Sequence, residues 1–294
     1  MFNRLWNSRK YILKTTFSAT ALIYALLGFV RTFVSFEGFY KPDIPVWCRV
    51  LVSVLILLVV CLVCILGECI NVLCTRKMKV VDGRNGKAVY VKYGDLFNEK
   101  ILGKSDGRRN ICFAVNRCFD TVVDNRLITE TSVHGAALKR VYKDGLFDPC
   151  SMNTAIQATI SPSAQFEQLT KEQKPEGNLK RYEVGTGADV TISDSLHFFM
   201  IAIGKMDSSL TISAKDGEYC LAIQRMIEFI DAYSQGFPVL LPILGAGLTR
   251  ISQDEPAILK YMVECLRMNK AHVNTDVYII IKDDAKERIS IMDL

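Results

Sequence analysis

Two long apolar runs open the chain and set it apart from the pattern that follows. Residues 15–30 and 50–67 contain no charged side chain, and the short segment 31–49 separates them. A helix of about 20 apolar residues crosses the hydrocarbon core of a bilayer. The pattern therefore predicts a two-helix membrane hairpin, with spans at about residues 12–34 and 46–75.

Lys and Arg are distributed unevenly around this hairpin. Residues 1–14 carry four cations and no acid, residues 75–92 carry six against one acid, and residues 31–49 carry three against two. Cations near helix ends favour the cytoplasmic side. We therefore expect a multi-pass protein of the inner membrane with both termini in the cytoplasm and a short external loop at Pro42 and Pro45. A cleaved signal peptide is the alternative for the first run, although no small-x-small cleavage site follows it.

Two features of the second run allow more than one interpretation. Cys61 and Cys64 form a C-x-x-C pair inside an apolar helix, but no second pair follows at zinc spacing. We therefore expect these cysteines to pack between helices, and we predict no metal site. Glu68 lies near the inner end of the run, where it either reaches the headgroups or lines a pore in an assembly.

From about residue 78 the pattern changes to alternating strand and helix periods. We take 1–77 as the transmembrane hairpin and 78–294 as one domain, which is long enough to bury a core. Predicted strands are 88–93, 110–115, 182–192, 196–203, 238–244 and 277–281. Predicted helices begin at Thr131 or Ser132 and end at Gly145, begin at Ser151, cover 218–235, and run from Asp254 to about Asn269. The polar segment 165–179 is expected to be a surface loop.

Apolar strands that alternate with helices imply an α/β fold, namely a three-layer α/β/α domain with a mixed sheet. Ligands of such sheets bind beyond the carboxyl ends of the strands. Three predicted strand ends carry suitable groups, at Gly94-Asp95, at Asn116 and at the 245–250 loop. A glycine-rich loop lets backbone N–H groups approach a phosphate. Gly245 and Gly247 alone are also compatible with a plain turn, since the third Rossmann glycine and a Walker A loop are absent.

Taken together, these segments resemble the macro domain, an ADP-ribose-binding α/β/α module, over residues 78–294. In that family, the element matched by Gly94–Leu96 accepts a hydrogen bond from the adenine amino group, and the element matched by Ala114–Asn116 reaches the distal ribose. Segments 132–137 and 242–247 are similar to the two phosphate loops. The resemblance implies ligand contacts from Asp95, Leu96, Asn116, Ser132, Val133, His134, Gly135, Leu244, Gly245, Ala246, Gly247, Leu248 and Arg250.

The chain departs from the hydrolytic members of this family at three places. Phe119 stands where they have a second Asn, residues 129–132 replace a glycine run, and residues 282–284 lack an adenine-stacking aromatic. His134 shows no orienting partner for general-base work, so it is expected to contact the ligand. Arg250 is either a phosphate contact or a solvated surface residue. These departures imply a binding domain with no catalytic residue and no cofactor, whose ligand is an ADP-ribose derivative.

A membrane hairpin joined to a macro-like domain resembles the transmembrane macro effectors of type II Thoeris antiphage defence. In that group a TIR-domain enzyme makes an ADP-ribose-derived signal, histidine-ADP-ribose in the second type, which the macro domain binds before the membrane part acts. The resemblance implies a ligand-gated homo-oligomer in the lipid bilayer, with the TIR enzyme as functional partner through the signal and no nucleic-acid partner. The alternatives are a membrane-anchored ADP-ribosyl hydrolase and a passive ADP-ribose-binding module.

Overall fold

The computed structural model describes residues 2–33, 45–103, 107–245 and 253–294, which fall into two compact units. The first unit comprises residues up to Arg76 together with Lys286–Asp293, and the second comprises Lys77–Ala285 with Leu294. The chain therefore leaves the first unit after Arg76 and comes back to it at Lys286. We call Lys286–Asp293 the returning segment.

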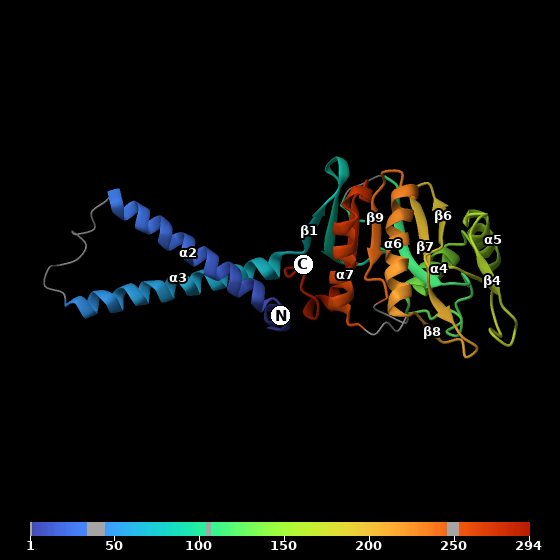
Figure 1. The fold of residues 1–294 in the computed structure, drawn as a ribbon, viewed down its shortest axis with the longest axis horizontal. Coiled ribbons are helices and arrows are strands. Elements are labelled where there is room, and N and C mark those ends of the chain that lie inside the picture. The colour runs from blue at the N-terminus through green and yellow to red at the C-terminus, as the bar shows by residue number, and fades with distance from the viewer. Residues whose placement is uncertain (1, 34–44, 104–106, 246–252) are drawn as a thin grey trace. The chain divides into compact units, whose positions relative to one another are not determined.

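The first unit is a helical hairpin. α2 (Arg9–Phe33) and α3 (Val46–Cys74) lie side by side after the short helix α1 (Phe2–Asn7) (Figure 1). Both long helices are long and apolar enough to cross a membrane. At 1.5 Å per residue, α3 measures about 43 Å, which exceeds a hydrocarbon core of about 30 Å. The external loop predicted around Pro42 lies outside the described residues.

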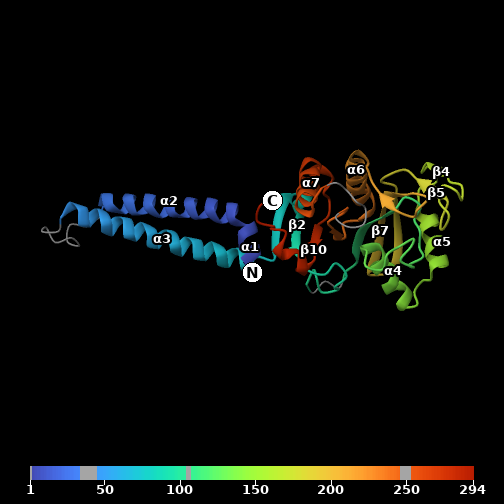
Figure 2. The ribbon, with the colours of Figure 1, turned by 90° about the horizontal axis from the view of Figure 1, so that it is seen from below.

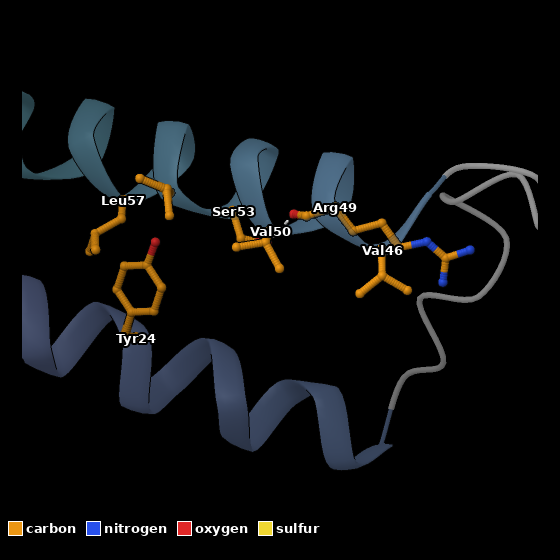
Figure 3. A pocket seen from close by; sticks show the side chains of 7 residues that line it. Tyr24, Val46, Arg49, Val50, Ser53 and Leu57 are labelled. Carbon is orange, nitrogen blue, oxygen red and sulfur yellow. Dashed lines mark hydrogen bonds between the residues drawn. The ribbon is translucent and has the colours of Figure 1, made fainter.

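A groove of about 380 Å³ opens between α2 and α3 (Figure 3). Tyr24 of α2 points toward α3, which contributes the apolar lining of Val46, Val50, Val54 and Leu57. Elsewhere between the two helices, Oγ1 of Thr20 lies 3.7 Å from Sγ of Cys61, which agrees with the predicted packing role of this cysteine. Glu68 accepts a hydrogen bond from Nδ2 of Asn71 at 3.2 Å, one turn further along α3.

Arg4 joins α1 to the end of α3. Its Nη1 and Nη2 donate to the carbonyl oxygens of Leu73 (3.1 Å) and Thr75 (2.7 Å). The last carbonyls of a helix have no partner within the helix and carry partial negative charge. The guanidinium therefore satisfies and neutralises this helix end, which explains why Arg4 is only 8% exposed.

The returning segment packs against the start of the same hairpin. Nδ2 of Asn7 donates to the carbonyl oxygen of Glu287 at 2.7 Å, and the hydroxyls of Ser8 and Ser290 share a hydrogen bond of 2.8 Å. Ile289 and Ile291 are buried. Residues far apart in the sequence thus complete the base of the first unit.

The second unit is built on a mixed sheet with strand order β1-β2-β10-β9-β3-β7-β6, and β8 pairs with β7. The inner strands β2, β10, β9, β3 and β7 run parallel, whereas β1 and β6 are antiparallel edges. A separate ribbon joins β4 to β5. The bounds are β1 Lys77–Asp82, β2 Ala88–Tyr93, β3 Arg109–Asn116, β4 Phe166–Gln168, β5 Lys180–Tyr182, β6 Gly187–Ser193, β7 Leu196–Met206, β8 Ile212–Ser213, β9 Val239–Pro242 and β10 Val277–Ile281.

Helices cover both faces of this sheet (Figure 2). They are α4 (Val133–Lys143) and α5 (Pro149–Thr159) on one face, and α6 (Asp216–Tyr233) and α7 (Glu255–Met268) on the other. Phe113 of β3 packs with Leu138 of α4 in one buried cluster, while Phe199 of β7 contacts Phe229 of α6 at 5.4 Å between ring centroids. Successive strand residues point to opposite faces, so doubly buried strands require both helical layers. The predicted three-layer mixed fold is confirmed.

Strands 88–93 and 277–281 match β2 and β10 residue for residue, and Asp254 caps α7 as predicted. Other details of the prediction were wrong. Asp148, not Ser151, caps α5, because Pro149 fixes the first helical position and Ser151 completes a capping box three residues later.

Three further differences concern strands. The predicted strand 182–192 is broken at Gly185, whose φ of 81° is left-handed, into β5 and β6. β1 was missed because three of its six residues are charged, as is typical of a protected edge strand. The polar segment 165–179 is not simply a surface loop, since it contains β4 and a fully buried Lys174.

Candidate functional site

The carboxyl ends of the parallel strands bring the predicted site segments to one edge of the sheet. Gly94 follows β2, Asn116 ends β3, and residues 243–245 follow β9. The backbone N–H of Gly94 donates to the carbonyl oxygen of Ile281 at 2.8 Å, which ties the end of β2 to the end of β10. This edge is where open α/β sheets bind ligands.

Asp95 is the exposed carboxylate at this edge. Its side chain is 59% exposed, and Oδ1 accepts a hydrogen bond from the backbone N–H of Phe97 at 3.0 Å. Oδ2 lies 4.0 Å from Nη2 of Arg140 on α4. Leu96 is buried and belongs to the core. Asp95 therefore remains accessible to a ligand, whereas Leu96 can offer only its backbone.

Asn116 is held firmly by its own neighbours. Its Nδ2 donates to Oδ2 of Asp120 at 3.0 Å, and its Oδ1 accepts from the backbone N–H groups of Cys118 (3.0 Å) and Asp120 (3.4 Å). A side-chain amide has two N–H donors and one carbonyl oxygen. One N–H of Asn116 is thus left over for a ligand, while its oxygen is occupied.

A buried ion pair lies beneath Asn116 and was missed from the sequence. Nζ of Lys174 lies 2.9 Å from Oδ2 of Asp120, and the two side chains are 0% and 1% exposed. Lys174 also donates to the carbonyl oxygens of Glu176 and Asn178, at 2.7 and 3.0 Å. Buried charges are tolerated when they are paired and hydrogen-bonded. This network fixes Asp120, and through it the orientation of Asn116.

The start of α4 forms the next wall of the site. Oγ of Ser132 accepts a hydrogen bond from the backbone N–H of Gly135 at 2.9 Å and donates to the carbonyl oxygen of Thr129 at 2.7 Å. A Cβ at position 135 would lie 2.2 Å from that carbonyl oxygen, so only glycine fits. Val133 is partly buried against the core. The Ser132 hydroxyl therefore caps the helix, and the helix amino terminus itself can attract an anion.

His134 is buried in the first turn of α4. Burial lowers the pKa of its imidazole to about 3, so the ring is neutral. Its ring lies 5.8 Å from that of Phe113, centroid to centroid. Within the part of the chain that the structure describes, the buried Nε2 has no hydrogen-bond partner. Such an unpaired polar atom costs free energy, and a ligand that supplies the partner recovers it.

Asn116, Ser132 and His134 line one cavity of about 80 Å³, and Asp95 and Leu244 are not part of its lining. Ligand pockets are typically about 300–1,000 Å³, so this cavity accommodates one group of a larger ligand. Its remaining lining residues are Ala114, Val115, Leu127, Ile128, Thr129 and Ile212. Ile212 of β8, Leu127 and Ile128 were not anticipated, because no local pattern links them to the strand ends.

The loop after β9 is described only in part. Leu244 is buried, and its carbonyl oxygen accepts a hydrogen bond from the hydroxyl of Tyr219 at 2.9 Å. Gly245 adopts a left-handed φ of 84°. The predicted contacts of Ala246, Gly247, Leu248 and Arg250 lie outside the described residues.

Phe119 does not border the cavity. Its side chain is fully buried and packs edge-to-face on Tyr182, with ring centroids 5.6 Å apart. Its φ of 51° is left-handed, which is uncommon for an aromatic residue. The left-handed turn thus places this ring in the core and away from the site. Among the described residues, no group of three His, Cys, Asp or Glu side chains is placed to hold a metal ion.

A mixed sheet between two helical layers, with a cavity at a parallel strand end and a helix amino terminus beside it, defines an α/β domain of the kind that binds phosphorylated nucleotides. A family model described as "Thoeris protein ThsA, Macro domain" matches residues 89–282. Because this match covers most of the chain, the chain belongs to the ThsA macro-domain family of Thoeris antiviral defence.

One curated protein and two solved structures are among those similar to parts of this chain. Thoeris protein ThsA of Bacillus amyloliquefaciens (strain Y2) is 27% identical over 253 residues, which are 84% of this chain and 76% of that protein. A mutant macrodomain of Oceanobacillus iheyensis covers 73% of this chain and 93% of its own, with 10% identity and a TM-score of 0.43. The macrodomain of Mycobacterium tuberculosis DarG covers 65% and 96%, with 14% identity and a TM-score of 0.38.

Proposed function

We propose that this chain is an antiphage effector of the inner membrane, with both termini cytoplasmic, whose macro domain binds an ADP-ribose-derived signal and whose hairpin then disrupts the bilayer. A TIR-domain enzyme would supply the signal, for which histidine-ADP-ribose is one candidate, and the effector would act as a homo-oligomer. The family match supports the defence role, and the two candidate spans support the membrane half.

The observation that carries the binding half is the cavity beside α4. It presents a neutral, buried imidazole whose Nε2 lacks a partner among the described residues, next to a helix amino terminus. Apolar side chains make up much of the remaining lining. A site of this kind binds a polar group of defined geometry and excludes water.

Binding without hydrolysis is supported by the same lining. None of the described lining residues is Asp or Glu, and the amide oxygen of Asn116 is already engaged by two backbone N–H groups. General acid–base catalysis needs a titratable group within reach of the reacting atoms. The neutral His134 has no described partner that would orient it for this task.

Calorimetry on the full chain in lipid nanodiscs tests the binding half, with ADP-ribose and ADP-ribose conjugated to histidine as ligands. We expect the variant His134→Gln to weaken binding by about tenfold, the equivalent of about 1.4 kcal/mol. His272→Gln is the matched control, because His272 is bonded to Asp231 and does not line the cavity. Equal affinity in the two variants would contradict the assigned role of His134.

Vesicles loaded with a fluorescent dye test the effector half. We expect leakage only when the protein and a bound ligand are both present. Binding without leakage would favour the passive module. Turnover of an ADP-ribosylated protein that disappears in Asn116→Ala would instead favour the membrane-anchored hydrolase.

A further inference from the structure

The outward side of α1 carries an aromatic pair that the proposed function does not use. Phe2 is 75% exposed and Trp6 is 58% exposed, and their rings stack with centroids 6.4 Å apart. The guanidinium carbon of Arg9 lies 4.9 Å from the centroid of the Trp6 ring. Two large exposed aromatic rings beside a cation form an apolar patch with a charged rim, which is typical of an interaction surface.

Contacts on the opposite side of α1 hold this pair outward. Arg4 and Ser8 are buried, bonded to the end of α3 and to Ser290 of the returning segment, respectively. Asn7 is bonded to the backbone of the same segment. The inner side of the helix is therefore the polar one, and the aromatic side faces away from the protein.

The charge around the pair indicates the chemistry of its partner. Arg9, Lys10 and Lys14 are exposed, and residues 1–14 contain no acid. The returning segment contributes two acidic groups within electrostatic reach, because Glu287 interacts with Lys286 and Arg4, and Asp293 with Lys10 and Arg9. Burial raises the pKa of Asp293, and the charges of Lys10 and Arg9 oppose this rise. Residues 1–14 and 286–293 together carry six cations and two acids, so this end of the hairpin is positive, which favours an anionic partner.

The position of the pair indicates where that partner lies. The candidate span α2 begins at Arg9, directly after α1. Trp and Lys or Arg are enriched where a span meets the headgroups, since a ring with an apolar body and a polar edge suits this level. Basic side chains next to a span attract anionic lipids.

We propose that this end of the hairpin binds anionic phospholipid headgroups. The binding surface, here called the interfacial face, consists of Phe2, Trp6, Arg9 and Lys10. The aromatic rings lie among the headgroups and the upper acyl chains, and Arg9 and Lys10 pair with lipid phosphates. This binding needs no nucleotide-derived signal, but it rests on the membrane placement of the hairpin in the proposed function.

The chain offers a direct test, because it contains two Trp residues at opposite ends of the hairpin. Trp47 is 64% exposed at the start of α3. The variant Trp47→Phe retains only Trp6, and Trp6→Phe retains only Trp47 as the matched control. Both full-length variants are placed in vesicles of phosphatidylcholine alone or with added phosphatidylglycerol, without nucleotide.

We expect Trp6 fluorescence to be quenched by lipids brominated near the headgroup and protected from iodide, and to shift to shorter wavelength as phosphatidylglycerol is added. The emission of Trp47 should not respond to phosphatidylglycerol. Replacing Arg9 and Lys10 together by Gln should remove the response of Trp6, whereas Lys143→Gln, at an exposed position on α4, should leave it unchanged.

Two results would overturn the proposal. Strong iodide quenching of Trp6 in both vesicle types would show that the interfacial face lies in water. Protection from iodide without quenching by brominated lipid would show that protein covers it, as a second copy of the chain would.

Discussion

Lys174 and Asp120 form an ion pair with both side chains fully buried, 54 residues apart in the sequence and 2.9 Å apart between Nζ and Oδ2. Asp120 also accepts hydrogen bonds from Nδ2 of Asn116 and the backbone N–H of Asn178. The pair thereby attaches the polar segment 165–179 to the end of β3, where the candidate site lies.

The variant Lys174→Met is expected to lower the free energy of unfolding by about 3–5 kcal/mol, because it leaves Asp120 charged and unpaired in the core. Thermal unfolding of the full chain, followed by intrinsic fluorescence, measures the loss. Lys171→Met, three residues earlier at an exposed position, should unfold like the wild type. Similar melting of the two variants would contradict a stabilising role for the pair.

His134 should make stability depend on pH. Its pKa is about 3 when folded and near 6.5 in the unfolded chain, because burial disfavours the charged ring. The unfolded chain therefore binds more protons between these values, and the folded state loses stability as the pH falls from about 6.5 toward 3. Above pH 6.5 the ring is neutral in both the folded and the unfolded chain, so the buried histidine no longer lowers the free energy of unfolding.

Melting temperatures measured from pH 7.5 down to pH 4.5 check this expectation. The decline should be shallower in His134→Gln than in the wild type, and His272→Gln should follow the wild type. A decline of equal slope in His134→Gln would exclude His134 as its source.

The variant Gly135→Ala should be destabilised by about 1–3 kcal/mol, the usual cost of overpacking. The added Cβ would meet the carbonyl oxygen of Thr129 at 2.2 Å, and relief of that clash moves the turn that lines the cavity. Gly217→Ala is the control, since nothing lies within 4 Å of a Cβ there. Chemical denaturation measures the free energy of unfolding of both variants. Equal values would show that the turn at Thr129 tolerates a Cβ at position 135.

The variant Phe119→Asn places at this position the residue type expected in hydrolytic macro domains. We nevertheless expect no turnover of an ADP-ribosylated substrate. The side chain at this position points into the core, and removing a large buried ring costs about 3–5 kcal/mol. We expect a less stable protein that releases no ADP-ribose from a modified protein substrate. Turnover above the wild-type level would show that position 119 reaches the site.

A flexible Gly-Ser insertion between Ala285 and Lys286 should separate signal binding from membrane damage. The returning segment attaches the second unit to the hairpin a second time. With that attachment loosened, we expect unchanged ligand affinity by calorimetry and reduced ligand-dependent dye leakage. The same insertion between Pro162 and Ser163, both exposed, is the control. Full leakage with the first insertion would mean that the attachment at Arg76 suffices.

Local patterns predicted most of this fold. Strands such as 277–281 and caps such as Asp254 follow from apolar periodicity and from hydrogen-bonding side chains at fixed offsets. The predictions that failed depend on contacts or capping geometry that the local sequence pattern does not determine. Lys174 looks solvated in sequence because its partner lies on another element, and Ser151 was predicted to cap α5 because serine is a common capping residue.

The sequence predicted which segments meet at the carboxyl edge of the sheet, whereas their role in ligand binding stays a prediction. Strand ends indicated Asp95, Asn116 and the start of α4, since parallel strands end at one edge. The sequence did not reveal that Asn116 is held by Asp120, or that Phe119 turns into the core through a left-handed φ. Both features depend on backbone conformation and on side-chain contacts, which the spacing of residues in the sequence does not reveal.

The hydrogen bond between Ser8 and Ser290 also bears on the order of assembly during synthesis. It joins positions 282 residues apart, so the apolar helices are synthesised long before the residues that complete their base. The helical hairpin of a nascent chain therefore lacks Ile289 and Ile291 until the whole macro domain has been made. A chain that stops before Lys286 therefore carries both long helices without the segment that completes their base.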